Sequence, residues 1–270
     1  MTGSMPRIFD RLAYSSRAEF AVVVGAGLIL RSDDRGPNTP AFNAGTRFFI
    51  GNLRATGIAL AKKILPKRLL EEVRRYRGFK KSERPIYLKL RITNQLGLNS
   101  RKVPQGARSF VFVCFGNIMR SPMSELFFKE AIARHRSIDA KIISAGLNAT
   151  SGKPAHPWAI AAAQDFGLSL EGHRATLLTR AMVDEADAIL AMDFQNQVEF
   201  VSRYPDAADK LFLLGAYSGA ARPIEIQDPF YGDLEETRRC YRLLEKCTRN
   251  LADSLDAIRT QSAVTSSEAR

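Results

Sequence analysis

A cysteine and an arginine stand five residues apart in the run V-F-V-C-F-G-N-I-M-R-S-P at residues 111–122. Residues 110–113 are aromatic or β-branched, which predicts a buried strand that ends at Cys114. A helical pattern over 123–134 follows, so the expected order is strand, tight loop and helix. Loop N–H groups and the positive end of a helix bind anions, and Arg120 adds a planar fork of donors that matches phosphate. The same field favours the thiolate of Cys114, a nucleophile beneath the bound phosphate.

The residues between and after this pair fit the same interpretation. Gly116 and Asn117 are the types that best tolerate positive φ in a tight loop. Ser121 can donate a hydrogen bond to the thiolate, and Pro122 suits the first turn of a helix. The alternative is a buried structural cysteine with an unrelated arginine nearby, and so many features in register disfavour it. The predicted phosphate-binding residues are Phe115, Gly116, Asn117, Ile118, Met119 and Arg120.

The run resembles the phosphate loop of the low-molecular-weight protein tyrosine phosphatases, whose usual form is C-x-G-N-x-C-R-S-P. Met119 stands where the family usually has a second cysteine, which in other members can form a reversible disulfide with the nucleophile.

A second element, D-P-F-Y-G at residues 228–232, follows the last predicted strand. Cleavage of a phosphate ester expels an alkoxide or phenoxide, so a positioned proton donor such as Asp228 assists it. Phe230 and Tyr231 could form a pocket wall and stack on an aromatic leaving group. An ordinary Asp-Pro turn is the alternative, but the family carries D-P-Y/F-Y-G at this point.

Four shorter segments resemble the family in the same order: S-A-G at 144–146, G-x-P-A at 152–155, G-H-R-A at 172–175 and M-D-x-x-N at 192–196. The resemblance covers residues 109–259. It implies that four residues form the hydrogen-bond network that holds the loop, namely Asn117, Ser121, Ser144 and His173. It also places Thr150 near the pocket wall, where many members have a larger apolar residue.

Strands and helices alternate along this part of the chain, which predicts a parallel sheet covered on both faces. The expected strands are 110–113, 140–144, 187–192 and 210–216, and the expected helices are 123–134, 154–166, 179–186, 194–203 and 233–260. Right-handed crossovers then give a small, flavodoxin-like α/β domain of the phosphotyrosine protein phosphatase I type. Its ligand should lie at the carboxyl edge of the strands, where Cys114 ends the first strand.

The chain of 270 residues has a formal net charge of +12, and this charge is unevenly spread. Residues 1–109 carry 22 Lys and Arg against 7 Asp and Glu, so the remainder is slightly acidic. We therefore expect a basic, mostly helical N-terminal region at 1–108, a phosphatase domain at 109–260 and a disordered tail at 261–270. Three cysteines do not make a disulfide framework, and a thiolate enzyme needs a reducing compartment, so we expect a cytoplasmic protein.

The N-terminal region shows basic helical patterns at 59–77 and 84–96 but resembles no family. One interpretation is a solvated basic face on helices that pack against the catalytic domain. Another is a peripheral contact of residues 59–91 with an anionic membrane surface. Nucleic-acid binding is disfavoured, because charge alone suggests it and no recognised module is present.

These features predict a protein tyrosine phosphatase that works through a cysteinyl-phosphate intermediate, without cofactor or metal. An arsenate reductase is the first alternative, since Cys240 and Cys247 could form a disulfide relay, although the relay pair of those enzymes precedes the D-P loop. A non-catalytic phosphate-binding module is the second. By family likeness the partner is a phosphotyrosine protein, such as a bacterial tyrosine kinase that controls exopolysaccharide export.

Overall fold

The computed structural model describes residues 67–97, 101–135, 139–222 and 224–268, with side chains from 71 to 255. The chain divides into two compact units, Met1–Leu70 and Glu71–Arg270, and the second is described below. The first eight residues of the helix expected at 59–77 lie outside the described residues.

Four parallel strands form one sheet in the order β2-β1-β3-β4. Their bounds are Ser109–Cys114 for β1, Lys141–Gly146 for β2, Ala188–Ala191 for β3 and Leu211–Leu213 for β4. The chain moves from β1 to β2 on one side and then returns to β3 on the other. The carboxyl ends of β1 and β3 therefore flank the point where ligands bind in sheets of this kind.

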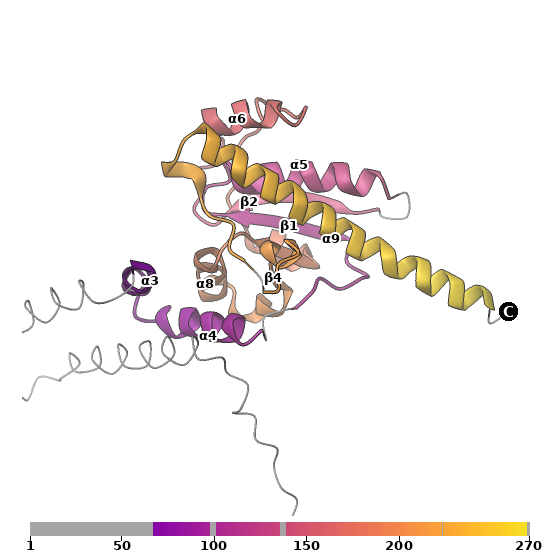
Figure 1. Ribbon diagram of the computed structural model, residues 1–270, viewed down its shortest axis with the longest axis horizontal. Helices are drawn as coiled ribbons and strands as arrows, with labels where there is room; N and C mark the ends of the chain where they lie inside the picture. Colours follow the sequence, from indigo (N-terminus) through magenta and orange to yellow (C-terminus); the bar gives the residue numbers. More distant parts are fainter. Residues whose placement is uncertain (1–66, 98–100, 136–138, 223, 269–270) are drawn as a thin grey trace, which may run out of the picture. The chain divides into compact units, whose positions relative to one another are not determined.

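Helices cover both faces of the sheet, as the continuous apolar strands require. Phe110 and Phe112 face one side, where their rings lie 5.0 and 5.3 Å from that of Phe128 in α5 (Arg120–Ala133). Helices α6 (Pro157–Gln164) and α9 (Leu234–Glu268) complete this layer (Figure 1). Val111 and Val113 face the other side, toward α7 (Arg180–Glu185) and α8 (Phe194–Arg203). The expected fold class is confirmed.

Two helices that precede the sheet pack against its α8 side. They are α3 (Lys67–Gly78) and α4 (Arg84–Gln95), and Gly97 ends the second with a φ of 71°, the conformation expected of a glycine cap. Phe79 and Tyr87 are buried in one cluster with Phe194 and Val198 of α8. This part of the basic region is therefore joined to the domain through an apolar contact.

Helix α6 begins at Pro157, whereas the sequence predicts a start at Pro154. Pro154 instead forms an isolated antiparallel bridge with Arg174, and Ala175 donates its N–H to the carbonyl of Lys153 at 2.8 Å. The G-x-P-A segment thus pairs with the G-H-R-A loop before the helix begins.

Strand β4 ends at Leu213, three residues earlier than expected, and a 3-10 helix, η3 (Leu214–Tyr217), follows. Gly215 there packs so closely on the backbone of Ile224 that a Cβ would lie 1.9 Å from its carbonyl oxygen. At the other end of the domain, α9 continues to Glu268, where a disordered tail after 260 is expected. No glycine or proline occurs between 261 and 268 to end the helix.

Candidate active site

The loop after β1 holds the sulfur of Cys114 at its base. Asn117 has a φ of 52°, the one non-glycine residue with positive φ among those described, and this conformation turns its N–H toward the Cys114 Sγ at 3.3 Å. The hydroxyl of Ser121 lies 3.0 Å from the same sulfur. Helix α5 then begins at Arg120 without a side-chain cap, so its first N–H groups are available to an anion.

The side chain of Asn117 holds the loop in shape. Its Nδ2 donates to the hydroxyls of Ser121 and Ser144, at 2.9 and 3.0 Å, and its Oδ1 accepts the Thr176 N–H at 2.8 Å. The His173 Nε2 lies 2.7 Å from the Asn117 carbonyl oxygen. The four residues that the sequence predicts as a supporting network are thus brought together by three segments distant in sequence.

Gly146, at the end of β2, lets the loop approach the sheet. A Cβ at this position would lie 2.8 Å from the Asn117 nitrogen and 2.9 Å from the Gly116 carbonyl carbon. Such distances do not occur for real side chains, so the S-A-G segment requires glycine here for close backbone approach.

Arg120 is 2% exposed and is held by three acceptors. Its Nη1 donates to Asp193 Oδ2 at 2.6 Å and to the Ile226 carbonyl at 2.9 Å. Its Nη2 donates to Asp228 Oδ2 at 2.5 Å. Burial opposes the charge of the guanidinium, but the carboxylates of Asp193 and Asp228 offset this and raise the pKa of Arg120 above its ordinary value.

Asp193 is the functional residue that sequence reasoning missed. It is interpreted there only as a helix cap, and it does cap α8, since its Oδ1 accepts the Asn196 N–H at 2.7 Å. The second carboxylate oxygen fixes Arg120. Its position in the sequence could have marked it as a site residue, because the M-D-x-x-N segment follows the carboxyl end of β3, the strand beside β1.

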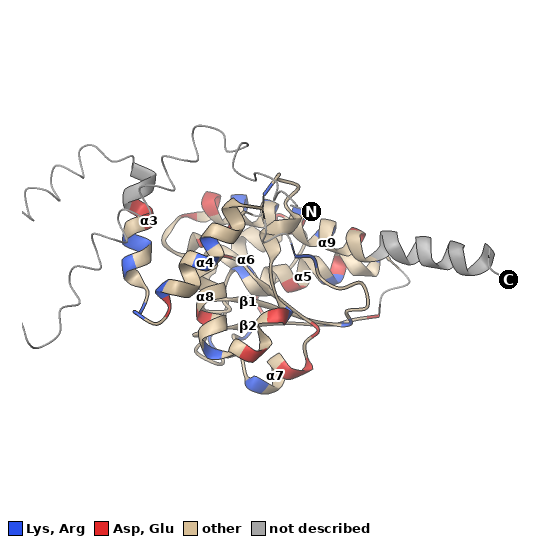
Figure 2. Ribbon diagram, turned by 90° about the horizontal axis from the view of Figure 1, so that it is seen from below, with Lys and Arg blue, Asp and Glu red and all other residues tan. Residues whose placement is uncertain are grey.

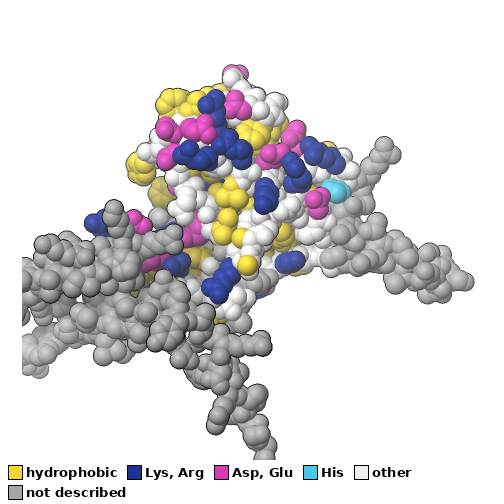
Figure 3. Space-filling model, viewed as in Figure 1, with side chains coloured by type: hydrophobic (Ala, Val, Ile, Leu, Met, Phe, Trp, Pro, Cys, Tyr) yellow, Lys and Arg dark blue, Asp and Glu magenta, His cyan; other side chains and the backbone are white. Residues whose placement is uncertain are grey.

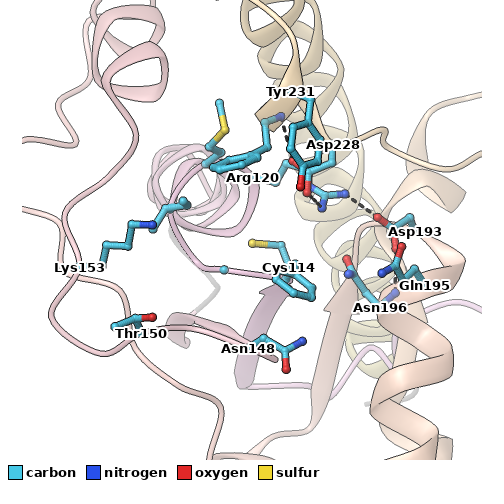
Figure 4. Close-up of a pocket in the computed structure, with 15 residues that line it drawn as sticks. Cys114, Arg120, Asn148, Thr150, Lys153, Asp193, Gln195, Asn196, Asp228 and Tyr231 are labelled. Atoms are coloured by element: carbon cyan, nitrogen blue, oxygen red, sulfur yellow. Dashed lines mark hydrogen bonds and ion pairs between the residues drawn. The ribbon is translucent and has the colours of Figure 1, made fainter. Parts of the chain in front are cut away.

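Asp228 lies at the rim of the pocket, with its side chain 40% exposed. Its Oδ1 accepts the N–H of Phe230 at 3.2 Å, which caps the short 3-10 helix η4 (Pro229–Tyr231). Figure 4 shows the Cys114 sulfur between Asp228 and Tyr231 on one side and Asn148 and Thr150 on the other. The proton donor and the nucleophile of the expected mechanism therefore face one cavity.

That cavity has a volume of about 420 Å³. Every sequence-predicted loop residue lines it except Asn117, which is buried behind the loop. Thr150, Phe230 and Tyr231 also line it, as expected of wall residues. Five lining residues were not predicted as part of the site: Asn148, Lys153, Asp193, Gln195 and Asn196.

The other two cysteines are buried thiols on α9. Burial raises the pKa of Cys240 to about 12, and that of Cys247 also to about 12. Neither is poised as a nucleophile at neutral pH, and neither is in a disulfide. Among the described residues, no group of three His, Cys, Asp or Glu could hold a metal ion.

The sequence profile of the family described as "Low molecular weight phosphotyrosine protein phosphatase" matches residues 109–261. The chain belongs to this family. It is 35% identical to the "Low molecular weight protein-tyrosine-phosphatase Wzb" of Escherichia coli K12 over 149 residues, which cover 55% of this phosphatase and 96% of Wzb. It is also 33% identical to the "Protein-arginine-phosphatase" of Bacillus subtilis over 145 residues, 54% of this chain and 95% of that protein.

Solved structures give the same family. The tyrosine phosphatase Wzb from E. coli K30, in complex with sulphate, matches this phosphatase with a TM-score of 0.51 and 32% identity, over 55% of this chain and 99% of Wzb. The family recognised from C-F-G-N-I-M-R-S-P is confirmed, and with it the expected enzyme class, a protein tyrosine phosphatase with a cysteine nucleophile. The arsenate reductase alternative is not favoured.

Proposed function

We propose that Cys114, Arg120 and Asp228 hydrolyse phosphotyrosine through a cysteinyl-phosphate on Cys114. The observation that carries this proposal is their convergence on one pocket, with the thiol at its base and the guanidinium and carboxyl group above it. A phosphate dianion that enters the pocket takes the place of the Asp228 carboxylate at Nη2 of Arg120. Nη1 stays bound to Asp193 and Ile226, which keeps the guanidinium aimed at the phosphate.

The reaction then has two steps. The Cys114 thiolate attacks phosphorus, the bond from phosphorus to the phenolic oxygen breaks, and protonated Asp228 gives its proton to that oxygen. The Asp228 carboxylate next takes a proton from a water molecule, which attacks the cysteinyl-phosphate and releases inorganic phosphate and the thiolate. Loop N–H groups and Arg120 stabilise the equatorial oxygens in both transition states.

The relatives include both a tyrosine and an arginine phosphatase, and the pocket walls favour the first substrate. Phe115, Phe230 and Tyr231 are exposed by 46%, 39% and 95%, and they offer aromatic surface to a phenyl ring. Of the two carboxylates that line the pocket, Asp193 has both oxygens occupied by the Asn196 N–H and Arg120, which leaves Asp228 as the acceptor for a guanidinium.

The physiological partner that we propose is a phosphotyrosine protein, such as a bacterial tyrosine kinase of exopolysaccharide export, in the cytoplasm. The similarity to the tyrosine phosphatase Wzb supports this class of partner.

None of the helices in the described part combines the length and apolar character that crossing a bilayer requires. We further propose peripheral contact with anionic lipid through residues 59–91. The exposed basic side chains of Arg77 and Lys80, at the end of α3 and in the turn after it, support it. Figure 2 shows the basic residues of α3 in blue.

The test is phosphate release by the full chain from a phosphotyrosine peptide and from the same peptide with phosphoarginine, with Cys114→Ser as control. We expect hydrolysis of the phosphotyrosine peptide, at least tenfold slower hydrolysis of phosphoarginine, and no turnover by Cys114→Ser. Full activity of Cys114→Ser would refute the mechanism, and faster phosphoarginine hydrolysis would refute phosphotyrosine as the substrate.

The lipid contact is tested by sedimentation with anionic vesicles. The protein should sediment with the lipid at low salt and stay in solution at high salt.

A further inference from the structure

Helices α3 and α4 lie before the family match, which begins at residue 109, yet one of their side chains reaches the surroundings of the active site. Arg75 of α3 forms a bidentate ion pair with Glu225, in which Nη1 donates to Oε2 and Nη2 donates to Oε1, both at 2.6 Å. The two side chains are only 26% and 12% exposed. A fork-to-fork pair of this kind fixes direction as well as distance.

Glu225 lies between the two groups that orient Arg120. Its Oε1 also accepts the N–H of Phe194 at 2.8 Å, and Phe194 follows Asp193 directly. On its other side, the next residue is Ile226, whose carbonyl accepts from Arg120 and whose N–H donates to the Met192 carbonyl at 2.8 Å. Asp228 comes two residues later. One carboxylate therefore joins α3, the start of α8 and the segment that carries the proton donor.

The helix pair presents Arg75 rigidly. Tyr87 of α4 donates its hydroxyl to Glu72 of α3 at 2.6 Å, and Arg91 bridges to Glu72 at 2.9 Å. The Arg91 guanidinium also lies 5.8 Å from the centre of the Phe194 ring. Burial opposes the charge of Arg75, but its hydrogen bond and ion pair with Glu225 raise its pKa above the ordinary value. Arg75 therefore stays charged throughout the working pH range.

We propose that Arg75 is a positioning residue for catalysis, acting through Glu225 on the two acceptors of Arg120 Nη1 and on the Asp228 segment. This inference rests on the proposed function. Removal of Arg75 leaves Glu225 as a partly buried, unpaired carboxylate close to Asp193. Because such a group turns toward water, the Phe194 N–H loses its acceptor, and the segment that continues to Ile226 and Asp228 loses its tie to α3. Part of the catalytic geometry is thus supplied by a helix outside the phosphatase domain proper.

The test measures kcat/KM of full-length Arg75→Ala for two substrates. Phenyl phosphate has a poor leaving group, phenolate, and p-nitrophenyl phosphate has a good one, p-nitrophenolate. We expect a loss of about tenfold for phenyl phosphate, the scale typical of groups that support a catalytic shell, and a smaller loss for p-nitrophenyl phosphate. A displaced Asp228 segment slows mainly the reaction that needs its proton. An equal fall for the two substrates would show that the Asp228 segment is not displaced, and it would overturn the proposal.

Arg74→Ala is the matched control, since Arg74 is the exposed neighbour on the same helix. We expect it to leave both values unchanged. Glu225→Ala removes both the ion pair with Arg75 and the acceptor for the Phe194 N–H. It should therefore reproduce the effect of Arg75→Ala, and the double variant should add nothing further. If Arg75→Ala does not fold, Glu225→Ala is the deciding variant. Activity of Arg75→Ala and Glu225→Ala within twofold of wild type refutes this inference but not the proposed function, which is tested separately with wild type and Cys114→Ser.

Discussion

Arg120 is the residue on which the site converges. Its side chain is buried, its Nη1 is held by Asp193 and Ile226, and its Nη2 is held by Asp228. A charged group so far from water is tolerated only because its donors are matched. Since the two carboxylates keep its pKa raised, the guanidinium stays charged at every pH at which the enzyme could work.

The contact between Arg120 and Asp228 leads to a prediction about Asp228. In Asp228→Asn the leaving oxygen departs without a proton, so kcat/KM for phenyl phosphate should fall about 10²–10⁴-fold, the usual contribution of a general acid. The fall for p-nitrophenyl phosphate should be much smaller, because its phenolate is stable without protonation. Steady-state kinetics with both substrates measure the difference.

Asp193→Asn is the control for this prediction. It loosens Arg120, which contacts the phosphoryl oxygens that both substrates share, so the two kcat/KM values should fall by the same factor. An equal fall for the two substrates in Asp228→Asn as well would show that Asp228 acts on the phosphate and is not the proton donor.

Residue identities could be predicted from the sequence where a motif carried them. The spacing of Cys114 and Arg120 and the D-P-F-Y-G element were enough to identify Cys114, Arg120 and Asp228, which line one pocket. Asp193 was missed because its role as a helix cap already accounted for it. The pairing of Arg75 with Glu225 joins positions 150 residues apart, and no local pattern marks it.

At the scale of elements, the site depends on where helices begin. The start of α5 at Arg120 without a side-chain cap leaves N–H groups for the phosphate, and the Tyr241 hydroxyl of α9 donates to the Met119 carbonyl at 3.2 Å on the far side of the loop. The start of α6 is different. There the Nδ1 of His156 accepts the N–H of Trp158 at 3.2 Å, and the His156 ring lies 5.5 Å from that of Phe230 in the pocket wall.

This cap predicts a pH effect. Burial, with a smaller contribution from Lys153, lowers the pKa of His156 below 6.5, so the ring is neutral and capping at pH 7. A lowered pKa means that the cap is present above it and is lost as the pH falls through it. Fluorescence of Trp158, the one tryptophan of the chain, should therefore change with a midpoint below 6.5.

The matched variant is His156→Asn, which keeps a capping oxygen but does not titrate. Its fluorescence should stay constant through this range. A midpoint at or above 6.5 in wild type, or the same titration in the variant, would contradict the assignment.

Several element bounds were predictable because the local signals were strong. The helix at 194–203 begins after a capping Asp and matches α8 at both ends. The predicted start of α6 and the predicted end of β4 were wrong, because tertiary contacts determine both. Pro154 pairs with Arg174 before α6, and Gly215 approaches Ile224 closely after β4. Hydrophobic periodicity does not carry such information.

At the scale of the molecule, charge separates the basic N-terminal part from the catalytic domain. In the domain, basic and acidic side chains are interspersed on the face shown in Figure 3, and many are paired, such as Arg238 with Asp165. The order of strands and helices predicted the sheet and its ligand-binding edge, since parallel connections leave few topologies. The interpretation that basic helices pack against the catalytic domain agrees with the contact that α3 and α4 make there. That α8 receives them could not be foreseen, because charge dominates the pattern of that segment.

The central claim is that Cys114 carries the phosphoryl group during turnover. The most direct measurement is rapid quenching of the full-length enzyme during hydrolysis of a phosphotyrosine peptide, followed by mass spectrometry of its cysteine-containing peptides. We predict one phosphoryl group on the Cys114 peptide and none on those of Cys240 or Cys247, whose pKa values of about 12 keep them as thiols. A phosphoryl group on another residue, or none on Cys114 while phosphate is released, would contradict this account.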